Sequence, residues 1–206
     1  MKLYYSPGAC SLAPHIVARE VGIELQLEKV DIKAKRTENG ADFYQINPKG
    51  SVPALELDNG ELLTEGPAIA QYLADLNPQS GLAPAYDTLA RYRLQEMLGF
   101  INSELHKSYS PLFNPATPAA LRLEHTTSLR KSYAFLEQRL TTHPWLLGDH
   151  FTAADAYLFT VTNWASYVNL ELAEYTALAA FQQRVAERPH VRAALEAEGL
   201  LSKVAV

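Results

Sequence analysis

The single cysteine of this chain, Cys10, is the residue best placed to do chemistry. It follows a short aromatic and apolar segment, residues 2–5, and stands just before residues 12–21, whose apolar positions have helical spacing. Backbone N–H groups and the positive end of a helix dipole favour a thiolate at such a position and lower the thiol pKa. We predict a reactive cysteine with a depressed pKa. Position alone leaves open the common alternative of a small buried core residue.

Cys10 has no partner thiol within the chain, since the residue three positions later is Ala13. One cysteine excludes an internal disulfide and the two-cysteine zinc sites. A reactive Cys10 would therefore exchange with an external thiol, most naturally a small cytosolic one. The six histidines show neither H-x-x-x-H nor H-E-x-x-H spacing, so we expect no metal site.

Two turns that contain proline carry candidate ligand contacts. Val52 precedes Pro53 at the start of an apolar segment, and a cis peptide there would expose the backbone of Val52, although most X–Pro bonds are trans. Residues 64–67 read Thr-Glu-Gly-Pro between an apolar run and a helix. Free N–H groups at a helix start bind a carboxylate and Glu65 binds an ammonium, which suits a zwitterionic amino-acid head. Helix capping by an acidic residue is the alternative.

A stripe of small and polar residues follows one face of a later helix. Its members, at i, i+4, i+7 and i+11, are Gly99, Ser103, His106 and Ser110. A glycine inside a helix costs about 1 kcal/mol relative to alanine, which indicates a close approach of another group at Gly99. The alternative for any one of these residues is a solvated helix face with a surface histidine.

Alternating strand-like and helix-like segments in the first 80 residues predict the framework that holds Cys10 and the two turns. Strands are expected over residues 2–5, 25–32, 52–57 and 61–64, and helices over residues 12–21, 41–46 and 67–76. A helix joins the first two strands, so they should be parallel, whereas Asn59-Gly60 predicts an antiparallel hairpin between the last two. The expected result is a mixed four-stranded sheet with helices packed on it.

A linker over residues 77–85 separates this region from one with helical patterns only. Amphipathic spacing predicts helices over residues 94–105, 121–140, 153–167 and 178–185. Thr152 and Asp155 fit a capping box at the start of the third of these helices. We expect α/β plus all-α architecture in two domains, residues 1–80 and residues 86–206.

Composition and charge exclude several classes of protein. The 206 residues are 48% hydrophobic and 20% charged, as in ordinary globular proteins, and the net charge is −5. A nucleic-acid-binding protein would show a basic excess or stripe, and neither occurs. The longest apolar run, residues 177–181, is far shorter than the ~20 residues of a membrane span, and prolines and polar residues interrupt any N-terminal signal peptide. We expect a cytoplasmic protein that binds neither nucleic acid nor membrane.

Several segments together resemble the beta class of bacterial glutathione transferases. They are residues 1–20, residues 50–55 (Gly-Ser-Val-Pro-Ala-Leu), residues 63–69 (Leu-Thr-Glu-Gly-Pro-Ala-Ile), residues 103–107 (Ser-Glu-Leu-His-Lys) and residues 148–155. Each segment alone is moderately specific. Their order and spacing, with Cys10 in place, make the resemblance specific along the whole chain.

The resemblance implies a fold, an assembly and a set of site residues. A thioredoxin-like N-terminal domain would bind glutathione, an all-helical C-terminal domain would line the electrophile site, and two chains would form a homodimer with active sites near the subunit interface. The assigned residues are Cys10 facing the glutathione sulfur, with Ser103, His106 and Lys107 nearby; the backbone of Val52, beside cis-Pro53, for the cysteinyl part; Glu65 and Gly66 for the γ-glutamyl end; and Lys35 for the glycine end.

Two positions depart from the pattern of the family. Many relatives have serine where this chain has Gly66, so a hydroxyl contact is lost while the N–H remains. Many have asparagine where this chain has Gly99, which removes a contact from the neighbouring subunit. Tyr5 and Ser11 resemble the sulfur-activating residues of other transferase classes, and we assign them a secondary role beside Cys10.

These observations predict a glutathione transferase that directs the glutathione thiolate at a small electrophile, as a detoxification enzyme does. One alternative is a glutathione-dependent thiol–disulfide or dehalogenating enzyme in which Cys10 itself forms the bond. Another is a non-catalytic protein that binds glutathione or another ligand, against which the presence of Cys10, Glu65 and His106 argues. An aromatic electrophile would fit a pocket lined by aromatic side chains, although aromatics at helical spacing are more often core residues; the candidates are Tyr109, Phe113, Trp164 and Tyr167.

Overall fold

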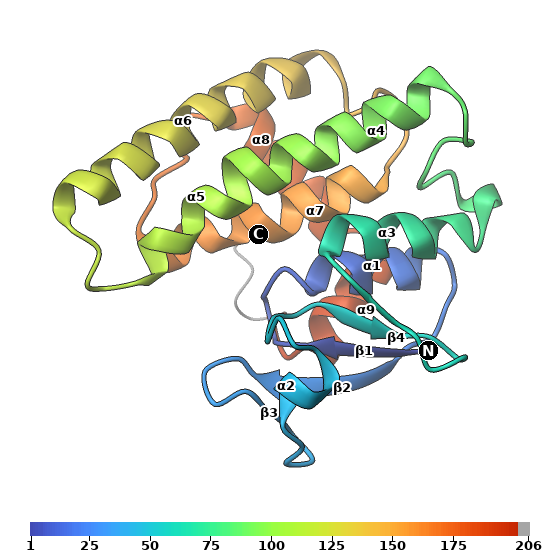
Figure 1. The fold of residues 1–206 in the computed structure, drawn as a ribbon. Coiled ribbons are helices and arrows are strands. Elements are labelled where there is room, and N and C mark those ends of the chain that lie inside the picture. Colours follow the sequence, from blue (N-terminus) through green and yellow to red (C-terminus); the bar gives the residue numbers. More distant parts are fainter. Residues whose placement is uncertain (202–206) are drawn as a thin grey trace.

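The computed structural model describes residues 1–201, and the first part of the chain forms a mixed sheet with three helices (Figure 1). In chain order these elements are β1 (Lys2–Tyr5), α1 (Leu12–Glu20), β2 (Gln26–Asp31), β3 (Arg36–Thr37), α2 (Phe43–Ile46), β4 (Ala54–Glu56), β5 (Leu62–Thr64) and α3 (Gly66–Asp75). Every strand and helix predicted for this region occurs, within a few residues of its expected bounds.

The strands lie in the order β3-β2-β1-β4-β5. β1 is parallel to β2 and β4 is antiparallel to β5, as the connections predict. β4 also pairs antiparallel with β1, which the sequence pattern does not predict. The mixed sheet has five strands instead of the expected four, because β3 pairs antiparallel with the end of β2. Arg36 and Thr37 are too few to make an alternating pattern, so only the pairing with β2 defines this strand.

Alternation along β1 distributes its side chains between two apolar layers. Leu3 and Tyr5 belong to the large core that α1 and α3 cover, whereas Tyr4 packs with Val30 and Phe43 on the opposite face, where α2 lies (Figure 1). Both faces of the sheet are therefore covered. The polar groups that could do chemistry are left to the turns between the strands and the helices.

The chain beyond residue 85 is helical, as predicted. Its elements are α4 (Leu89–Phe100), a π-helical segment (Ile101–His106), α5 (Lys107–Tyr109), α6 (Ala119–Thr142), α7 (Ala153–Thr162), α8 (Thr176–Ala186) and α9 (Pro189–Ala197), with 3-10 helices over Ser110–Phe113 and Asn163–Val168. A further 3-10 helix, Pro78–Ser80, lies in the preceding linker. Figure 1 shows α4 to α8 on the side of the sheet that α1 and α3 cover. Among residues 1–201, no helix has both the length and the apolar content that a membrane span requires.

Two helices of this region differ from the sequence prediction. The helix expected over residues 153–167 ends as an α-helix at Thr162 and continues as a 3-10 helix. The sequence pattern does not predict α9, because its buried residues Val191, Ala194 and Leu195 span little more than one turn, too few for a helical period to be recognised. α9 packs against α1, and this contact returns the end of the chain to the first domain.

The central helix of this region is α7, whose residues are all buried. The predicted capping box fixes its start: the Asp155 carboxylate accepts hydrogen bonds from the backbone N–H groups of Thr152 and Leu146, both at 2.8 Å. α7 packs against α1 on one side and α4 on the other. It therefore sets the spacing between the turn that holds Cys10 and the helix that holds His106.

Candidate active site

A cavity of about 520 Å³ lies between the turns of the N-terminal sheet and the helical segment that continues α4. Eight of the residues assigned from the sequence line it: Cys10, Val52, Pro53, Glu65, Gly66, Ser103, His106 and Lys107. The other lining residues are Asn47, Lys49, Ser51, Thr64, Asn102, Ser110 and Tyr157. The cysteine, the two proline turns and the polar stripe, which are far apart in the sequence, therefore meet in one place.

Cys10 lies in the turn between β1 and α1, and its Sγ donates a hydrogen bond to the carbonyl oxygen of Val52 at 3.2 Å. Burial raises the pKa of the Cys10 thiol to about 12, and the backbone N–H groups of Cys10 and Ser11 oppose this rise only in part. The predicted depressed pKa is therefore wrong for the free protein, because the loss of hydration outweighs the effect of the helix start. Cys10 is a neutral thiol that donates a hydrogen bond.

The turn before β4 presents backbone rather than side chains to the cavity. The peptide bond between Val52 and Pro53 is cis, as the family resemblance implies. The side-chain amide of Asn47 donates a hydrogen bond to the carbonyl of Ser51 at 2.7 Å, which holds the preceding loop in place. An extended peptide bound in the cavity can pair with the polar backbone groups at such a wall.

The turn before α3 holds Glu65 with a positive φ of 71°, a conformation that non-glycine residues rarely adopt outside functional sites. Its carboxylate makes no capping hydrogen bond to α3, so the capping alternative is wrong. Instead it accepts a hydrogen bond from the Lys49 ammonium at 2.7 Å, and the Thr64 hydroxyl accepts one from the same group at 2.9 Å. Glu65 thus binds a primary ammonium in the free protein, the type of group predicted for its ligand.

The helical wall of the cavity is shaped by the π-helical segment Ile101–His106. Such segments change the register of side chains along a helix and are frequent at functional sites. Asn102, Ser103 and His106 all line the cavity. Gly99 lies before the segment and does not line the cavity. Within residues 1–201, apart from its chain neighbours and the backbone of its own helix, no atom lies within 4 Å of the place where its Cβ would be. The close approach predicted at Gly99 is therefore wrong within a single chain.

His106 is held by a hydrogen bond and by an aromatic contact. Its Nδ1 is 2.6 Å from the hydroxyl of Tyr157, which in turn donates a hydrogen bond to Asn102 Oδ1 at 3.0 Å. The imidazole meets the indole ring of Trp164 edge-on, with the centroids 4.8 Å apart. Burial, assisted by the charge of Lys107, lowers the pKa of His106 to about 4. His106 is therefore uncharged near pH 7.

Tyr157 and Asn102 are site residues that sequence reasoning missed. Tyr157 lies 51 residues from His106 in the chain, in a helix whose residues are all buried, so its type and pattern indicate a core residue. Asn102 falls on the cavity face because the helix becomes π-helical there. A regular helical period offers no local signal for either residue.

Besides Gly99, three residues assigned from the sequence lie outside the lining of the cavity. Tyr5 belongs to the large core, and burial raises the pKa of its phenol. The Ser11 hydroxyl is fully buried and donates to the carbonyl of Ser6, so it serves the turn before α1. Lys35 donates a hydrogen bond from its ammonium to the carbonyl of Gly50 at 2.7 Å, one residue before the loop that borders the cavity.

The four aromatic residues expected around an electrophile divide into two groups, and none of them lines this cavity. Tyr109 is fully buried and shares a hydrogen bond with Tyr133, so it belongs to the core. Trp164 is also buried, and its indole N–H donates to the carbonyl of Gly8 at 2.8 Å. Phe113 and Tyr167 are exposed, with 47% and 59% of their surface open to solvent.

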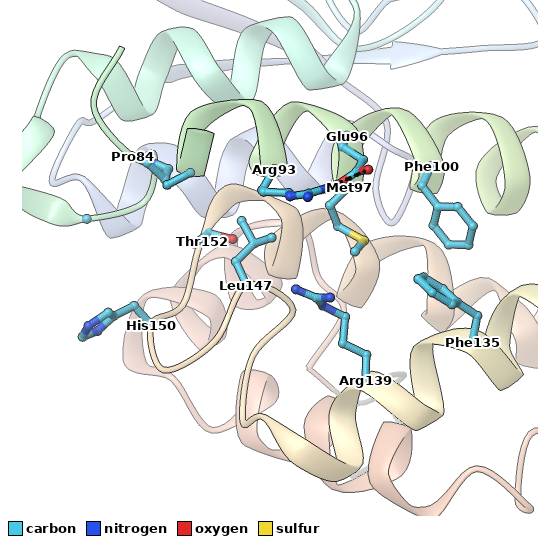
Figure 2. Close-up of a pocket in the computed structure, with 12 residues that line it drawn as sticks. Pro84, Arg93, Glu96, Met97, Phe100, Phe135, Arg139, Leu147, His150 and Thr152 are labelled. Carbon is cyan, nitrogen blue, oxygen red and sulfur yellow. Dashed lines mark hydrogen bonds and ion pairs between the residues drawn. The ribbon is translucent and has the colours of Figure 1, made fainter. Parts of the chain in front are cut away.

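A larger cavity of about 800 Å³ lies between α4, α6 and the loop before α7 (Figure 2). Figure 2 shows Phe100 and Phe135 facing one another at one end, with ring centroids 5.1 Å apart, and the Arg139 side chain extending from α6 toward α4. On the rim Arg93 pairs with Glu96 at 2.8 Å. None of the described residues that line this cavity was assigned a chemical role, so size alone does not make it the active site.

Two family models match the chain. The model described as the glutathione S-transferase N-terminal domain covers residues 1–75, and that described as the glutathione S-transferase C-terminal domain covers residues 100–189. Over 200 residues the chain is 50% identical to glutathione S-transferase GstA of Escherichia coli O157:H7, an alignment that covers 97% of this chain and all of that protein.

Solved structures of similar sequence have the same fold. A sphingomonad glutathione S-transferase in complex with glutathione matches with a TM-score of 0.93 and 50% identity, over 97% of this chain and 100% of that one. A bacterial beta class glutathione S-transferase of Sphingomonas chungbukensis matches with a TM-score of 0.93 and 46% identity, over the same shares of the two chains.

Proposed function

The chain belongs to the bacterial beta class of the glutathione S-transferase family, and we propose that the cavity around Cys10 is where it joins glutathione to a small electrophile. One observation carries the assignment of the site: the Cys10 turn, the Val52 backbone, the Glu65 turn and His106 all line one cavity of about 520 Å³. That volume lies within the usual range for small-molecule sites.

Three groups of glutathione match residues that line the cavity, and a fourth matches Lys35, which lies outside the lining. The γ-glutamyl ammonium of glutathione fits the Glu65 carboxylate, and its γ-glutamyl carboxylate fits the N–H of Gly66 at the start of α3. Its cysteinyl backbone pairs with Val52. Its glycine carboxylate fits the ammonium of Lys35, which in the free protein donates to the carbonyl of Gly50. Side chains with charge opposite to the ligand thus stand at both ends of the binding groove.

This orientation places the glutathione sulfur between Cys10 and His106. The neutral Cys10 thiol already donates a hydrogen bond, and it can turn that donation from the Val52 carbonyl to the glutathione sulfur. A donor at this place stabilises the glutathione thiolate without forming a bond to it. A covalent role for Cys10 requires the thiolate of Cys10 itself, and its raised pKa opposes that form. Non-covalent assistance is therefore the role we assign.

We propose an aromatic compound as the electrophile. Phe113 is exposed, and its ring lies 5.8 Å from that of Trp164, which in turn contacts His106. Trp164 is itself buried, so Phe113 is the ring of this group that is open to a substrate. A planar aromatic substrate would stack on Phe113 with its reacting carbon toward the glutathione sulfur.

We also propose that each chain has two domains, residues 1–80 and residues 86–206, and that two chains form a homodimer. This dimer would act in detoxification in the cytoplasm. Tyr86, Leu89 and Tyr92 expose 64%, 70% and 59% of their surface around the start of α4, a cluster typical of protein–protein contacts. Glutathione is a thiol of reducing compartments, which supports the cytoplasm. Light scattering of the purified protein should give twice the mass of one chain, and the mass of a single chain would reject the dimer.

A pair of assays tests the proposed function. The protein is incubated with glutathione and an aromatic halide, and in parallel with a mixed disulfide of glutathione. We expect conjugate formation in the first assay and little reduction in the second. Disulfide reduction without conjugation would favour the covalent alternative, and glutathione binding without either reaction would favour a non-catalytic protein.

A further inference from the structure

The hydrogen bonds of Tyr157 determine which ring nitrogen of His106 carries the proton. The Tyr157 hydroxyl donates to Asn102 Oδ1 at 3.0 Å and lies 2.6 Å from His106 Nδ1. A phenol has one proton to donate. Because that proton goes to Asn102, the proton in the contact with His106 belongs to Nδ1. His106 is therefore the Nδ1–H tautomer, and its Nε2 carries a lone pair.

The Nε2 atom faces a space where a ligand can reach it. His106 lines the cavity, and within residues 1–201 its Nε2 has no hydrogen-bond partner. Nε2 is not buried, so a ligand in the cavity can contact it. The imidazole has little freedom to turn, because Trp164 packs against it edge-on with the ring centroids 4.8 Å apart. Tyr157, whose hydroxyl is in hydrogen-bond contact with Nδ1, is itself only 2% exposed. The structure thus presents a fixed hydrogen-bond acceptor to the cavity.

The charged and titratable groups around His106 come from four elements. Lys107 follows it on the same helical wall and disfavours a second proton, Glu65 before α3 favours it, and burial is the largest influence, so the pKa of His106 is about 4. Tyr157 on α7 and Cys10 before α1 have pKa values raised by burial and are neutral. His106 is therefore an uncharged acceptor at pH 7.

We propose that Tyr157 and Asn102 are positioning residues that hold His106 as a proton acceptor for the glutathione thiol. The inference rests on the proposed function, because it requires glutathione in this cavity. In the step, the S–H bond of glutathione breaks and an Nε2–H bond forms on His106. The sulfur electron pair then attacks the electrophilic carbon, and the leaving group departs with its bonding pair. The imidazolium returns its proton to solvent through the cavity.

A proton acceptor on the enzyme gives a characteristic pH dependence. A neutral thiol and a neutral His106 coexist between the pKa of His106, about 4, and an ordinary thiol pKa of ~8.5. With the acceptor in place, kcat/KM should be nearly constant from about pH 5.5 to 8. Without it, the reaction depends on glutathione thiolate from solution, and kcat/KM should rise about tenfold per pH unit up to the thiol pKa.

Tyr157→Phe removes the hydroxyl and keeps the buried ring. We expect this variant to lose the plateau, that is, the range from about pH 5.5 to 8 in which kcat/KM is nearly constant. Its kcat/KM should be at least tenfold below wild type at pH 6.5 and close to wild type at pH 9. KM for glutathione should change less than twofold. Tyr133→Phe is the matched control, since Tyr133 is also a buried tyrosine whose hydroxyl is hydrogen-bonded, to Tyr109, but it lies outside the cavity lining. It should keep the plateau.

Asn102→Ala tests whether the direction of the hydrogen bond between Tyr157 and His106 matters, because it leaves the Tyr157 ring in place. Asn102 is exposed, so the protein should fold normally without its amide. Within residues 1–201, His106 Nδ1 is then the one remaining group in hydrogen-bond contact with the Tyr157 hydroxyl. We expect Tyr157 to donate its proton to Nδ1, which moves the histidine proton to Nε2. We expect the plateau to be lost although Tyr157 still contacts His106. Long-range ¹H–¹⁵N spectra of labelled protein, with the His106 signal assigned through a His106→Gln variant, should show Nδ1–H in the wild type and Nε2–H in Asn102→Ala.

The outcomes distinguish this inference from the proposed function. A wild-type protein that forms no conjugate contradicts the proposed function. A wild-type protein that forms the conjugate, but shows Nε2–H in the spectrum or an unchanged plateau in Tyr157→Phe, contradicts only the positioning role of Tyr157 and Asn102. Loss of the plateau in both variants, with the tautomer reversed in Asn102→Ala, supports the inference.

Discussion

The two walls of the active-site cavity are built in different ways. The sheet side supplies Cys10, the Val52 backbone and Glu65, each from a turn of a few consecutive residues that follows or precedes a strand. The helical side supplies His106, whose orientation depends on Tyr157, 51 residues away. In the function that we propose, local turns set the binding of glutathione, whereas packing between distant helices sets the chemistry at its sulfur.

The electrostatics of the walls differ in the same sense. Glu65 and Lys49 form an ion pair in which both side chains are more than half exposed. On the other wall, burial lowers the pKa of His106 and raises the pKa of Tyr157 and of Cys10. Each shift favours the neutral form of the side chain. We therefore propose that charge recognises the ends of glutathione on the exposed side, and that neutral hydrogen bonds position and accept the thiol proton on the buried side. The four predictions below test this division.

The largest effect is expected from removing the acceptor on the buried wall. His106→Ala should lower kcat for conjugation at pH 7 by roughly 100-fold, in the usual range for loss of a positioned acid–base group. Glutathione affinity should change less than threefold, since the ends of the ligand contact the other wall. Steady-state kinetics at pH 7 measures both quantities.

The same variant tests whether His106 acts or merely packs. An equal loss of kcat at pH 7 and pH 9 would indicate a structural role, because thiolate from solution replaces an acid–base group at high pH. Thermal unfolding of His106→Ala, measured alongside, shows how much of any loss comes from instability. Unchanged kcat and pH profile with a lowered Tm would contradict the division of roles between the walls.

A second prediction concerns the acid sensitivity that the buried wall imposes on the fold. The pKa of His106 is about 4 in the folded protein and 6.5 when unperturbed. The unfolded state therefore binds the proton first as pH falls, and the folded state loses stability between pH 6.5 and 4, by ~2–3 kcal/mol at most. Above pH 6.5 the full stability is present. Urea unfolding at pH 7.5 and pH 4.5 measures the loss.

The control for this prediction is His106→Gln, which lacks the titrating ring. Its free energy of unfolding should fall less than that of the wild type between the two pH values, because the carboxylates titrate alike in both proteins. An equal fall in the two proteins would mean that His106 is hydrated enough to take up its proton normally.

The third prediction addresses the exposed wall. Glu65→Ala should weaken glutathione binding by about 10- to 100-fold, since a hydrogen bond to a charged group contributes ~1.5–3 kcal/mol. The Tm should change little because Glu65 makes no cap to α3. Calorimetric titration measures the affinity. Glu96→Ala removes an equally exposed and paired carboxylate outside this cavity, and its affinity should equal that of the wild type.

The contrast between the walls explains which parts of the molecule the sequence predicts. The strands themselves, the hairpin and the turn at Glu65 follow from patterns within a few residues, and they agree with the structure apart from the two-residue strand β3, which these patterns do not predict. Nor do they predict the order of the strands in the sheet. The pKa of Cys10 could not be predicted in the same way. The helix start lowers it, but the burial that raises it more depends on residues that fold over the turn from elsewhere in the chain.

Tyr157 illustrates the same limit on the other wall. In the sequence it is one aromatic residue of an apolar helix, and such residues usually serve the core. The role that we propose for its hydroxyl depends on the packing of α7 beside the π-helical segment, which brings Asn102 and His106 within hydrogen-bond distance. The close approach predicted at Gly99 failed for the converse reason, since no other part of the described chain comes near it.

The smallest effect, and the most specific to this chain, is expected at Lys49. Its ammonium occupies the Glu65 carboxylate at 2.7 Å in the free protein, so the γ-glutamyl ammonium of glutathione must displace it. An exposed ion pair contributes ~0–1 kcal/mol, and removing this competitor should therefore tighten glutathione binding by up to about fivefold. Lys49→Met keeps the aliphatic stem, and calorimetry measures the affinity.

Lys33→Met serves as the control for net charge, because Lys33 is exposed and lies outside this cavity. Tighter binding in Lys49→Met alone would identify Lys49 as a competitor for Glu65. Weaker binding would mean that Lys49 contacts the ligand itself, and the exposed wall would then bind glutathione with one more cation than we assign to it.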